Sequence, residues 1–279
     1  MALVGDDFAA HSGASSPPSL SLVIPAYNEE KRLSSLLETL ATSAAPTVRG
    51  AGMELLETLI VDDGSSDRTA EILREATGRD ERLRPVLDFD QNRGKGAAFA
   101  SGVERARGDY VLLADVDLST PLEELPTLTA AVRDGADIAI GSRAVPGAVV
   151  ERGPAHRKLT GSVFNSTVRL LTGLSLRDTQ NGFKLFRTEA VQQLVRDQAC
   201  PGFAFDVELL MRADRAGLRI DEVPIRYLHD PRSSVRVVSA SASMLRDVSA
   251  LAYRYRVRGA DGPRKGRTTS FAKPADEAD

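Results

Sequence analysis

The chain has little cysteine and no long apolar run. Cys200 is the one thiol among 279 residues, so no disulfide can form within the chain, and this scarcity favours a cytoplasmic location. No apolar run approaches the roughly 18 residues that predict a membrane-spanning helix. Met1 to Asp7 lacks a basic segment followed by an apolar one, so we expect no secretory signal peptide. Any contact with a membrane is expected at its surface.

Two common nucleotide-binding motifs are also missing. No G-x-x-x-x-G-K-[ST] occurs, which excludes P-loop kinases and ATPases, and no G-x-G-x-x-G follows the first predicted strand, which disfavours dinucleotide oxidoreductases. The net charge is −3, from 36 basic and 39 acidic residues, so nothing in the overall charge indicates a nucleic-acid partner. The sequence leaves the oligomeric state undetermined.

What is present is an ordinary globular composition, with 42% hydrophobic and 27% charged residues. The length suits one large domain or two small ones with a sizeable core. Residues 1–19 are small and polar, and residues 259–279 are polar and charged, so neither end can bury enough apolar surface to order itself. We expect two disordered tails around a single domain at 20–258.

Apolar runs and helical leucine spacings alternate along the first half. Strands are predicted at 20–24, 55–61, 83–87, 110–114 and 138–140, and helices at 32–40, 67–76, 94–106 and 121–132. This alternation predicts an α/β fold with a mainly parallel sheet flanked by helices. The second half predicts helices at 158–171, 205–216 and 239–256 and a strand at 183–187. Pro224 interrupts 219–228, which indicates an edge strand or two strands with a kink.

The final predicted helix carries one apolar stripe, formed by Met244, Leu245, Val248, Leu251, Ala252 and Tyr255, with arginines around it. Two interpretations are open. The helix can lie at an anionic lipid surface, or it can pack on the sheet with its basic face in solvent. We favour packing.

Asp115-Val116-Asp117 is the most informative motif. It follows a predicted buried strand, and two carboxylates one residue apart are costly there unless something neutralises them. A divalent cation that bridges a diphosphate would do so, because Mg²⁺ often takes one or two carboxylates together with substrate phosphates. Alone, the motif would also fit a solvated turn.

Polar clusters follow five predicted strands. They occupy residues 25–30, 62–67, 92–96, 115–117 and 141–143, which all lie along one edge of a parallel sheet, where ligands of open α/β sheets bind. Their residue types indicate a nucleotide. A base can stack near Tyr27 while Asp62 accepts hydrogen bonds from the base or the ribose. Gly94 and Gly96 let backbone N–H groups approach phosphate oxygens, and Lys95 adds positive charge.

These motifs, in this order, resemble family 2 glycosyltransferases of GT-A fold. The residues that carry the resemblance lie at 21–29, 60–65, 115–119 and 141–143. A further resemblance, to the dolichyl- or polyprenyl-phosphate glycosyltransferases, is carried by Arg157-Lys158 and by the segments 178–186, 205–209 and 222–225. Within that group, this chain resembles the dolichyl-phosphate glucosyltransferases most. The resemblance covers residues 20–256. It departs at Ser119, where several relatives carry a glutamine as a further metal ligand.

The resemblance implies a nucleotide-sugar-binding half at 20–143 and an acceptor-side half at 144–258. It implies that Mg²⁺ or Mn²⁺ is held by Asp115 and Asp117. The donor-binding residues it implies are Pro25, Ala26, Tyr27, Glu29, Asp62, Asp63, Gly94, Lys95, Asp115, Val116 and Arg143. The acceptor-side residues it implies are Arg157, Lys158, Gln180 and Lys184. Asp178 is the candidate base if the acceptor is a hydroxyl.

The resemblance implies an inverting transfer of a hexose to a polyprenyl phosphate, and the leading donor is UDP-glucose. GDP-mannose as donor, or a soluble small metabolite as acceptor, are the alternatives. A nucleotidyltransferase or a nucleotide-sugar-binding protein is disfavoured, because Pro25-Ala26-Tyr27 stands where a G-x-G-x-R type signature would be expected.

Overall fold

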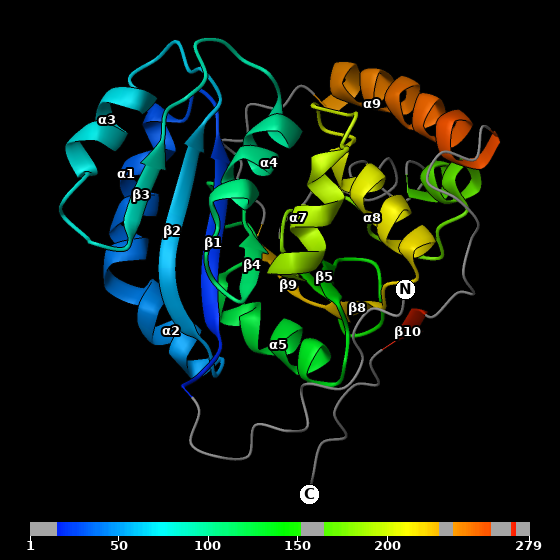
Figure 1. Cartoon of the computed structure of the whole chain (residues 1–279), viewed down its shortest axis with the longest axis horizontal. Helices are drawn as coiled ribbons and strands as arrows, with labels where there is room; N and C mark the ends of the chain where they lie inside the picture. The colour runs from blue at the N-terminus through cyan, green and yellow to red at the C-terminus, as the bar shows by residue number, and fades with distance from the viewer. Residues whose placement is uncertain (1–15, 152–164, 229–236, 258–268, 272–279) are drawn as a thin grey trace, which may run out of the picture.

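One mixed sheet organises the molecule. The computed structural model describes residues 16–151, 165–228, 237–257 and 269–271. Eight strands form the sheet in the order β10-β8-β5-β7-β4-β1-β2-β3, with helices on both sides (Figure 1). The predicted α/β fold with a mainly parallel sheet is therefore confirmed.

The first half alternates as predicted. Strands β1 (Ser19–Ala26), β2 (Glu54–Asp62), β3 (Leu83–Val86) and β4 (Tyr110–Leu113) run parallel to one another. The helices between them are α1 (Glu30–Thr39), α3 (Thr69–Ala76) and α4 (Lys95–Arg105). A π-helical turn, η1 (Leu40–Ala44), and α2 (Ala45–Gly50) continue α1 and were not predicted.

An antiparallel strand enters the middle of the sheet. β7 (Lys184–Arg187) lies between β4 and β5 (Ile138–Ser142) and runs against both. At its start, Lys184 pairs with Leu113 near the end of β4 and with Ile140 near the end of β5. Because β7 runs backwards, the residues that precede it reach the edge where the parallel strands end. Residues 178–183 thereby join the predicted ligand-binding edge.

The remaining elements complete the second half. A 3-10 turn, η2 (Leu122–Glu124), and α5 (Leu125–Arg133) precede β5, and residues 165–172 are helical. Helices α7 (Thr188–Arg196) and α8 (Phe205–Ala216) follow β7, and α9 (Val237–Ala252) ends in a π-helical segment, η3 (Tyr253–Val257). Helix α7 was not predicted, although its buried positions Val191, Leu194 and Val195 have helical spacing.

Pro224 separates two strands, as one of the two open interpretations predicted. β8 (Ile220–Pro224) pairs with β5, whereas β9 (Arg226–Leu228) pairs with β6 (Val149–Glu151) in a separate small parallel sheet. Proline has no backbone N–H to donate, so a strand can change partners at such a position.

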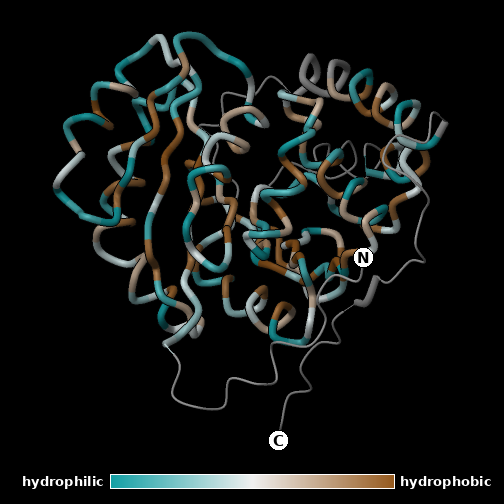
Figure 2. Tube along the Cα trace, viewed as in Figure 1, coloured by the Kyte–Doolittle hydropathy of each residue, from teal (hydrophilic) through white to brown (hydrophobic). Residues whose placement is uncertain are grey.

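Side-chain alternation along the strands builds one hydrophobic layer on each face. Val23, Val61 and Leu113 face a layer that includes residues of α4, α7, α8 and α9. Leu22 and Ile24 face the opposite layer, which includes residues of α1, α2, α3 and α5. Figure 2 shows the hydrophobic colour concentrated in the strands between these helices.

The chain ends differ in detail from the predicted tails. Ser19 belongs to β1, where its backbone N–H and hydroxyl both donate to Asp109. β10 (Thr269–Phe271) lies inside the stretch predicted as a disordered C-terminal tail and pairs parallel with β8. Three residues of β10 therefore pair with three residues of β8, and no periodic sequence pattern signals this pairing.

The apolar stripe of α9 is packed, as favoured. Val248, Leu251 and Tyr255 are buried in the layer that contains α8, while Arg246 is exposed. The segment contacts α8, where the Tyr255 hydroxyl donates to Glu208 at 2.6 Å. Among the residues that the structure describes, no helix is long and apolar enough to span a membrane.

Candidate active site

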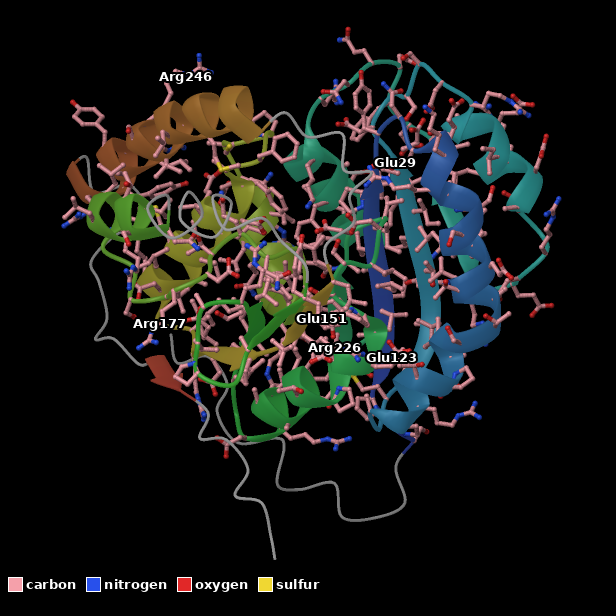
Figure 3. All side chains as sticks on the ribbon, turned by 180° about the vertical axis from the view of Figure 1, so that it is seen from behind. Glu29, Glu123, Glu151, Arg177, Arg226 and Arg246 are labelled. Atoms are coloured by element: carbon pink, nitrogen blue, oxygen red, sulfur yellow. The ribbon has the colours of Figure 1, made fainter. Side chains whose placement is uncertain are left out.

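The predicted polar clusters converge at one edge of the sheet. Ala26 at the end of β1 pairs with Asp62 at the end of β2, and the backbone N–H of Asp63 donates to the Ala26 carbonyl at 2.8 Å. Pro25 and Ala26 are buried in this strand end. Figure 3 shows Glu29 where the chain leaves β1 and enters α1. Parallel strand ends thus bring together segments that lie far apart in the sequence.

The loops after β1 and β2 form the part of this edge where the nucleoside is predicted to bind. Asn28 has a left-handed backbone (φ 55°), and its side-chain oxygen accepts from the backbone N–H groups of Ser66 at 2.9 Å and Asp67 at 3.4 Å. Asp62 accepts from the Ser65 hydroxyl, and Tyr27 is 44% exposed beside these loops. A flat exposed ring next to a carboxylate suits a base and a ribose, which is the predicted role of this pair.

Asp63 is engaged inside the protein. Its carboxylate accepts from the backbone N–H groups of Arg93 and Gly94, both at 2.8 Å, and from the Asn92 side-chain amide at 2.9 Å. Burial raises the pKa of Asp63, and the two backbone donors partly offset the rise. Asp63 therefore fixes the loop that leads into α4. Its predicted contact with the nucleoside would compete with these three hydrogen bonds.

Arg32, which was not predicted as a site residue, links two residues that were. Its guanidinium donates two hydrogen bonds of 2.6 Å to Glu29 and lies 3.6 Å from a carboxylate oxygen of Asp117. The other oxygen of Asp117 accepts from the Ser119 backbone N–H at 3.0 Å. The sequence holds one signal for Arg32: it follows Glu29 by three residues at the start of a helix. Oppositely charged side chains at that spacing are neighbours on the helix surface.

Asp115 is paired with Lys95. The Lys95 ammonium at the start of α4 lies 2.5 Å from Asp115 Oδ1. Burial alone would raise the pKa of Asp115, but Lys95, followed by Lys184 and Arg143, lowers it below its ordinary value. Val116 is buried between them, whereas the side chains of Asp115 and Asp117 are 37% and 15% exposed.

Gly182 lies directly on the Asp115 carboxylate. A Cβ atom at position 182 would fall 2.2 Å from Asp115 Oδ2, closer than any side chain tolerates. The backbone that leads into β7 therefore covers one side of this carboxylate, and glycine is needed for so close an approach.

The carboxylates suit a divalent ion that shares its ligands with a diphosphate. Asp115 and Asp117 offer two oxygen ligands, and the described residues contain no group of three or more histidine, cysteine, aspartate or glutamate side chains that could enclose a metal alone. The Ser119 hydroxyl, two residues after Asp117, is buried without a hydrogen-bond partner. Two carboxylates plus substrate phosphates and water is an arrangement typical of Mg²⁺.

Arg143 is oriented by Asp178. Its guanidinium donates to both oxygens of Asp178, at 2.7 and 2.8 Å, and stacks over the Tyr227 ring with 5.0 Å to the centroid. Burial alone would raise the pKa of Asp178, but Arg143 lowers it. Glu222 accepts from the Asp178 backbone N–H at 2.7 Å and so fixes Asp178 in turn. A carboxylate with both oxygens engaged and a lowered pKa is poorly suited to the general-base role predicted for Asp178.

Lys184 is internal, which differs from its predicted acceptor-binding role. Its side chain is 1% exposed and donates to Asp206 at 2.8 Å and to the Asn181 carbonyl. It could reach an acceptor only by leaving both partners. Gln180 is also engaged, because its side-chain nitrogen lies 2.5 Å from the Met244 sulfur. Arg157 and Lys158 lie outside the described residues.

Residues 21–195 match the family model described as Glycosyl transferase family 2. This chain belongs to that family. It is therefore a glycosyltransferase, of a class of enzymes that use nucleotide sugars.

Curated relatives are similar over most of the chain. A dolichyl-phosphate beta-glucosyltransferase of Drosophila melanogaster is 34% identical over 247 residues, which cover 85% of this chain and 76% of that protein. A polyprenol monophosphomannose synthase of Mycolicibacterium smegmatis is 32% identical over 242 residues, with 85% and 87% covered. Glycosyltransferase AglD of Haloferax volcanii is 34% identical over 219 residues, which are 78% of this chain but 34% of that longer protein.

Solved structures confirm the GT-A fold. Glucosyl-3-phosphoglycerate synthase from Mycobacterium tuberculosis in complex with UDP superimposes with a TM-score of 0.60 at 21% identity, covering 91% of this chain and 86% of that one. The same enzyme with Mn²⁺, UDP and glucosyl-3-phosphoglycerate gives 0.59 at 19% identity, covering 91% and 85%. At such identity the likeness concerns the fold.

Proposed function

We propose that this enzyme transfers glucose from UDP-glucose to a polyprenyl phosphate with inversion at the anomeric carbon. The observation that carries the reaction class is the convergence of Asp115, Asp117 and Arg143 at one sheet edge, beside the exposed ring of Tyr27. Two carboxylates and a guanidinium side by side suit a metal-bound diphosphate. The lipid-phosphate acceptor and the glucose are supported by the similarity to a dolichyl-phosphate beta-glucosyltransferase, which is 34% identical over 85% of this chain.

The donor would lie across the ends of β1, β2 and β4. Tyr27 and Asp62 would hold the nucleoside, while Pro25, Ala26 and Glu29 line this part of the edge. Asp115 and Asp117 would hold Mg²⁺ or Mn²⁺, with Val116 anchoring the turn between them. A bound divalent ion neutralises charge on the departing diphosphate, an effect worth several kcal/mol.

Positive side chains would orient the phosphates and the sugar. Gly94 opens α4 with a positive φ of 108°, and Lys95 follows it at the start of that helix. Arg143 is held in one orientation by Asp178, so its guanidinium is preorganised and loses little freedom on binding an anion.

A phosphate acceptor needs positioning more than deprotonation. Its oxygen is already ionised near neutral pH, so the transfer needs no general base, in agreement with the engagement of Asp178 by Arg143. The resemblance assigns Arg157 and Lys158 to the acceptor phosphate. A polyprenyl acceptor also implies that the enzyme works against a membrane surface.

Two alternatives rest on specific similarities. GDP-mannose as donor is favoured by the 32% identity with the polyprenol monophosphomannose synthase. A small phosphorylated metabolite as acceptor is the second alternative, because glucosyl-3-phosphoglycerate synthase, a structural neighbour, names such a product.

One reaction panel separates these functions. The protein is incubated with Mg²⁺ or Mn²⁺, with UDP-glucose or GDP-mannose, and with a short polyprenyl phosphate or 3-phosphoglycerate. Products are identified by mass. We expect hexosyl polyprenyl phosphate from UDP-glucose. If only GDP-mannose gives product, the mannosyl alternative replaces the proposal. If only 3-phosphoglycerate is glycosylated, the small-metabolite alternative replaces it.

A further inference from the structure

Two ammonium–carboxylate pairs lie next to each other at this site. Lys95 and Asp115 form the outer pair at 2.5 Å, with side chains 20% and 37% exposed. Lys184 and Asp206 form the inner pair at 2.8 Å, with side chains 1% and 5% exposed. Asp206 lies in the first turn of α8 and has no role in the donor or acceptor sets described above.

The two pairs are electrostatically coupled. Burial alone would lower the pKa of Lys95, but Asp115, and after it Asp206, raises it. Burial raises the pKa of Asp206, and Lys184, followed by Lys95, opposes that rise. Lys95 is therefore attracted by both carboxylates, although it is hydrogen-bonded to Asp115.

Tight backbone packing fixes these groups relative to one another. A Cβ at Gly96 would lie 2.5 Å from the Cβ of Phe205, so the start of α4 touches the start of α8. The Ala97 backbone N–H also donates to the Pro201 carbonyl at 3.1 Å. Lys95 on α4 and Asp206 on α8 are thus held in one arrangement by their helices.

The Lys95 ammonium forms an ion pair with Asp115, the carboxylate that the proposed function assigns to a divalent ion. Two cations on one carboxylate repel each other strongly at such distances in a partly buried site. We propose that Lys95 is a built-in counter-ion of Asp115 that a divalent metal must displace, and that Asp206 keeps the displaced ammonium inside the site. This inference rests on the proposed function, because it concerns the same metal carboxylate.

Asp206 is the positioning residue in this arrangement. An ammonium that loses its carboxylate partner in a buried site needs another one, since an unpaired buried charge is costly. Asp206 provides that partner. The displaced ammonium then stays beside the place where the donor diphosphate would lie. Metal binding without nucleotide should be weak, because the metal must first replace Lys95 at Asp115.

Metal binding without nucleotide tests the exchange directly. The full chain and its Lys95→Met variant are titrated with Mn²⁺, and free Mn²⁺ is followed by electron paramagnetic resonance. We expect Lys95→Met to bind Mn²⁺ about tenfold more tightly than the wild type, since it loses a competing charge-assisted hydrogen bond. Lys31→Met, at an exposed position of α1, removes the same charge away from Asp115 and should match the wild type.

Asp206 is tested by a double-mutant cycle. Asp206→Asn should lower the affinity for Mn²⁺ in the absence of nucleotide. Without the Asp206 carboxylate, Lys95 has no second carboxylate to move to and stays paired with Asp115. If Asp206 acts through Lys95, the same substitution has a smaller effect in the Lys95→Met background, with a coupling of about threefold or more. Equal effects in both backgrounds would overturn the role of Asp206. Should Asp206→Asn not fold, the Lys95→Met comparison still decides the exchange.

The outcomes separate this inference from the proposed function. If Mn²⁺ binds the wild type and Lys95→Met equally well, or the variant more weakly, the exchange is wrong while the glycosyl-transfer assignment stands. If no Mn²⁺ binds either protein, with or without UDP, the proposed metal-dependent function fails and the inference fails with it.

Discussion

At the scale of single residues, the carboxylates after β4 are not equivalent. Asp115 is bonded to Lys95 and covered by Gly182, whereas Asp117 has one oxygen on the Ser119 backbone and the other 3.6 Å from Arg32. Asp117 therefore has the weaker internal partners. It is the carboxylate that a metal can engage at the lower cost.

Asp117→Ala should abolish transfer while the fold is retained. The variant removes a proposed metal ligand but no strong internal ion pair, so we expect kcat/KM to fall by about a thousandfold or more, with little change in unfolding temperature. Steady-state rates and thermal unfolding measure the two quantities. Wild-type turnover in the variant, or full wild-type activity in excess chelator, would remove the metal role.

Asp62→Ala should weaken nucleotide binding more than it slows the bound-state reaction. Asp62 lies where the nucleoside is proposed to bind, far along the edge from Arg143, and its hydrogen bond from Ser65 stays within one loop. We expect a raised KM for the donor at nearly unchanged kcat, the pattern of lost uniform binding. A collapse of kcat at constant KM would show that Asp62 serves the reacting centre instead.

At the scale of elements, the antiparallel strand β7 decides what reaches the site. Its reversed direction carries residues 178–183 to the ends of β4 and β5, where Asp178 meets Arg143 and Gly182 meets Asp115. A parallel strand at this place would send the same residues to the opposite edge. Residues from the second half of the chain therefore reach Asp115 and Arg143 through one strand.

Gly182→Ala tests this contribution. The added methyl would lie 2.2 Å from Asp115 Oδ2, so the carboxylate or the β7 entry must shift. A displacement of about 1 Å at a reacting centre can cost roughly a hundredfold in rate, and we expect a loss of that size in kcat/KM. Gly202→Ala is the matched control, because a Cβ there meets nothing within 4 Å. Equal activity of both variants would show that the approach of Gly182 is unimportant.

At the scale of the whole molecule, a buried carboxylate ties the opposite end of the sheet together. Glu57 of β2 is fully buried and accepts hydrogen bonds from Ser21 at 2.9 Å, from the Arg107 backbone at 2.8 Å and from the Arg84 guanidinium. Burial would raise the pKa of Glu57, but these donors together lower it below 4.5. Ionised Glu57 thus stabilises the fold far from the site.

Glu57→Gln should be less stable than the wild type by about 1–3 kcal/mol at pH 7, since it weakens hydrogen bonds to a charged acceptor. A lowered pKa in the folded state means that this contribution is complete above about pH 4.5 and is lost as the pH falls through the folded-state value. Urea unfolding of both proteins at several pH values measures the difference. A gap that stays constant or widens at lower pH would contradict this account.

The sequence by itself determined the α/β class, the alternation of the first half and the polar clusters at the strand ends. Each of these follows from local patterns, such as apolar runs, leucine spacing and turn residues. The ordered motifs also predicted the family, which the match over residues 21–195 confirms. The tertiary structure decided which charges meet. Pairs such as Lys95 with Asp115 and Arg143 with Asp178 join residues 20 and 35 positions apart, with no periodic signal. Sheet order and the direction of β7 place them together, and those depend on packing across the whole chain.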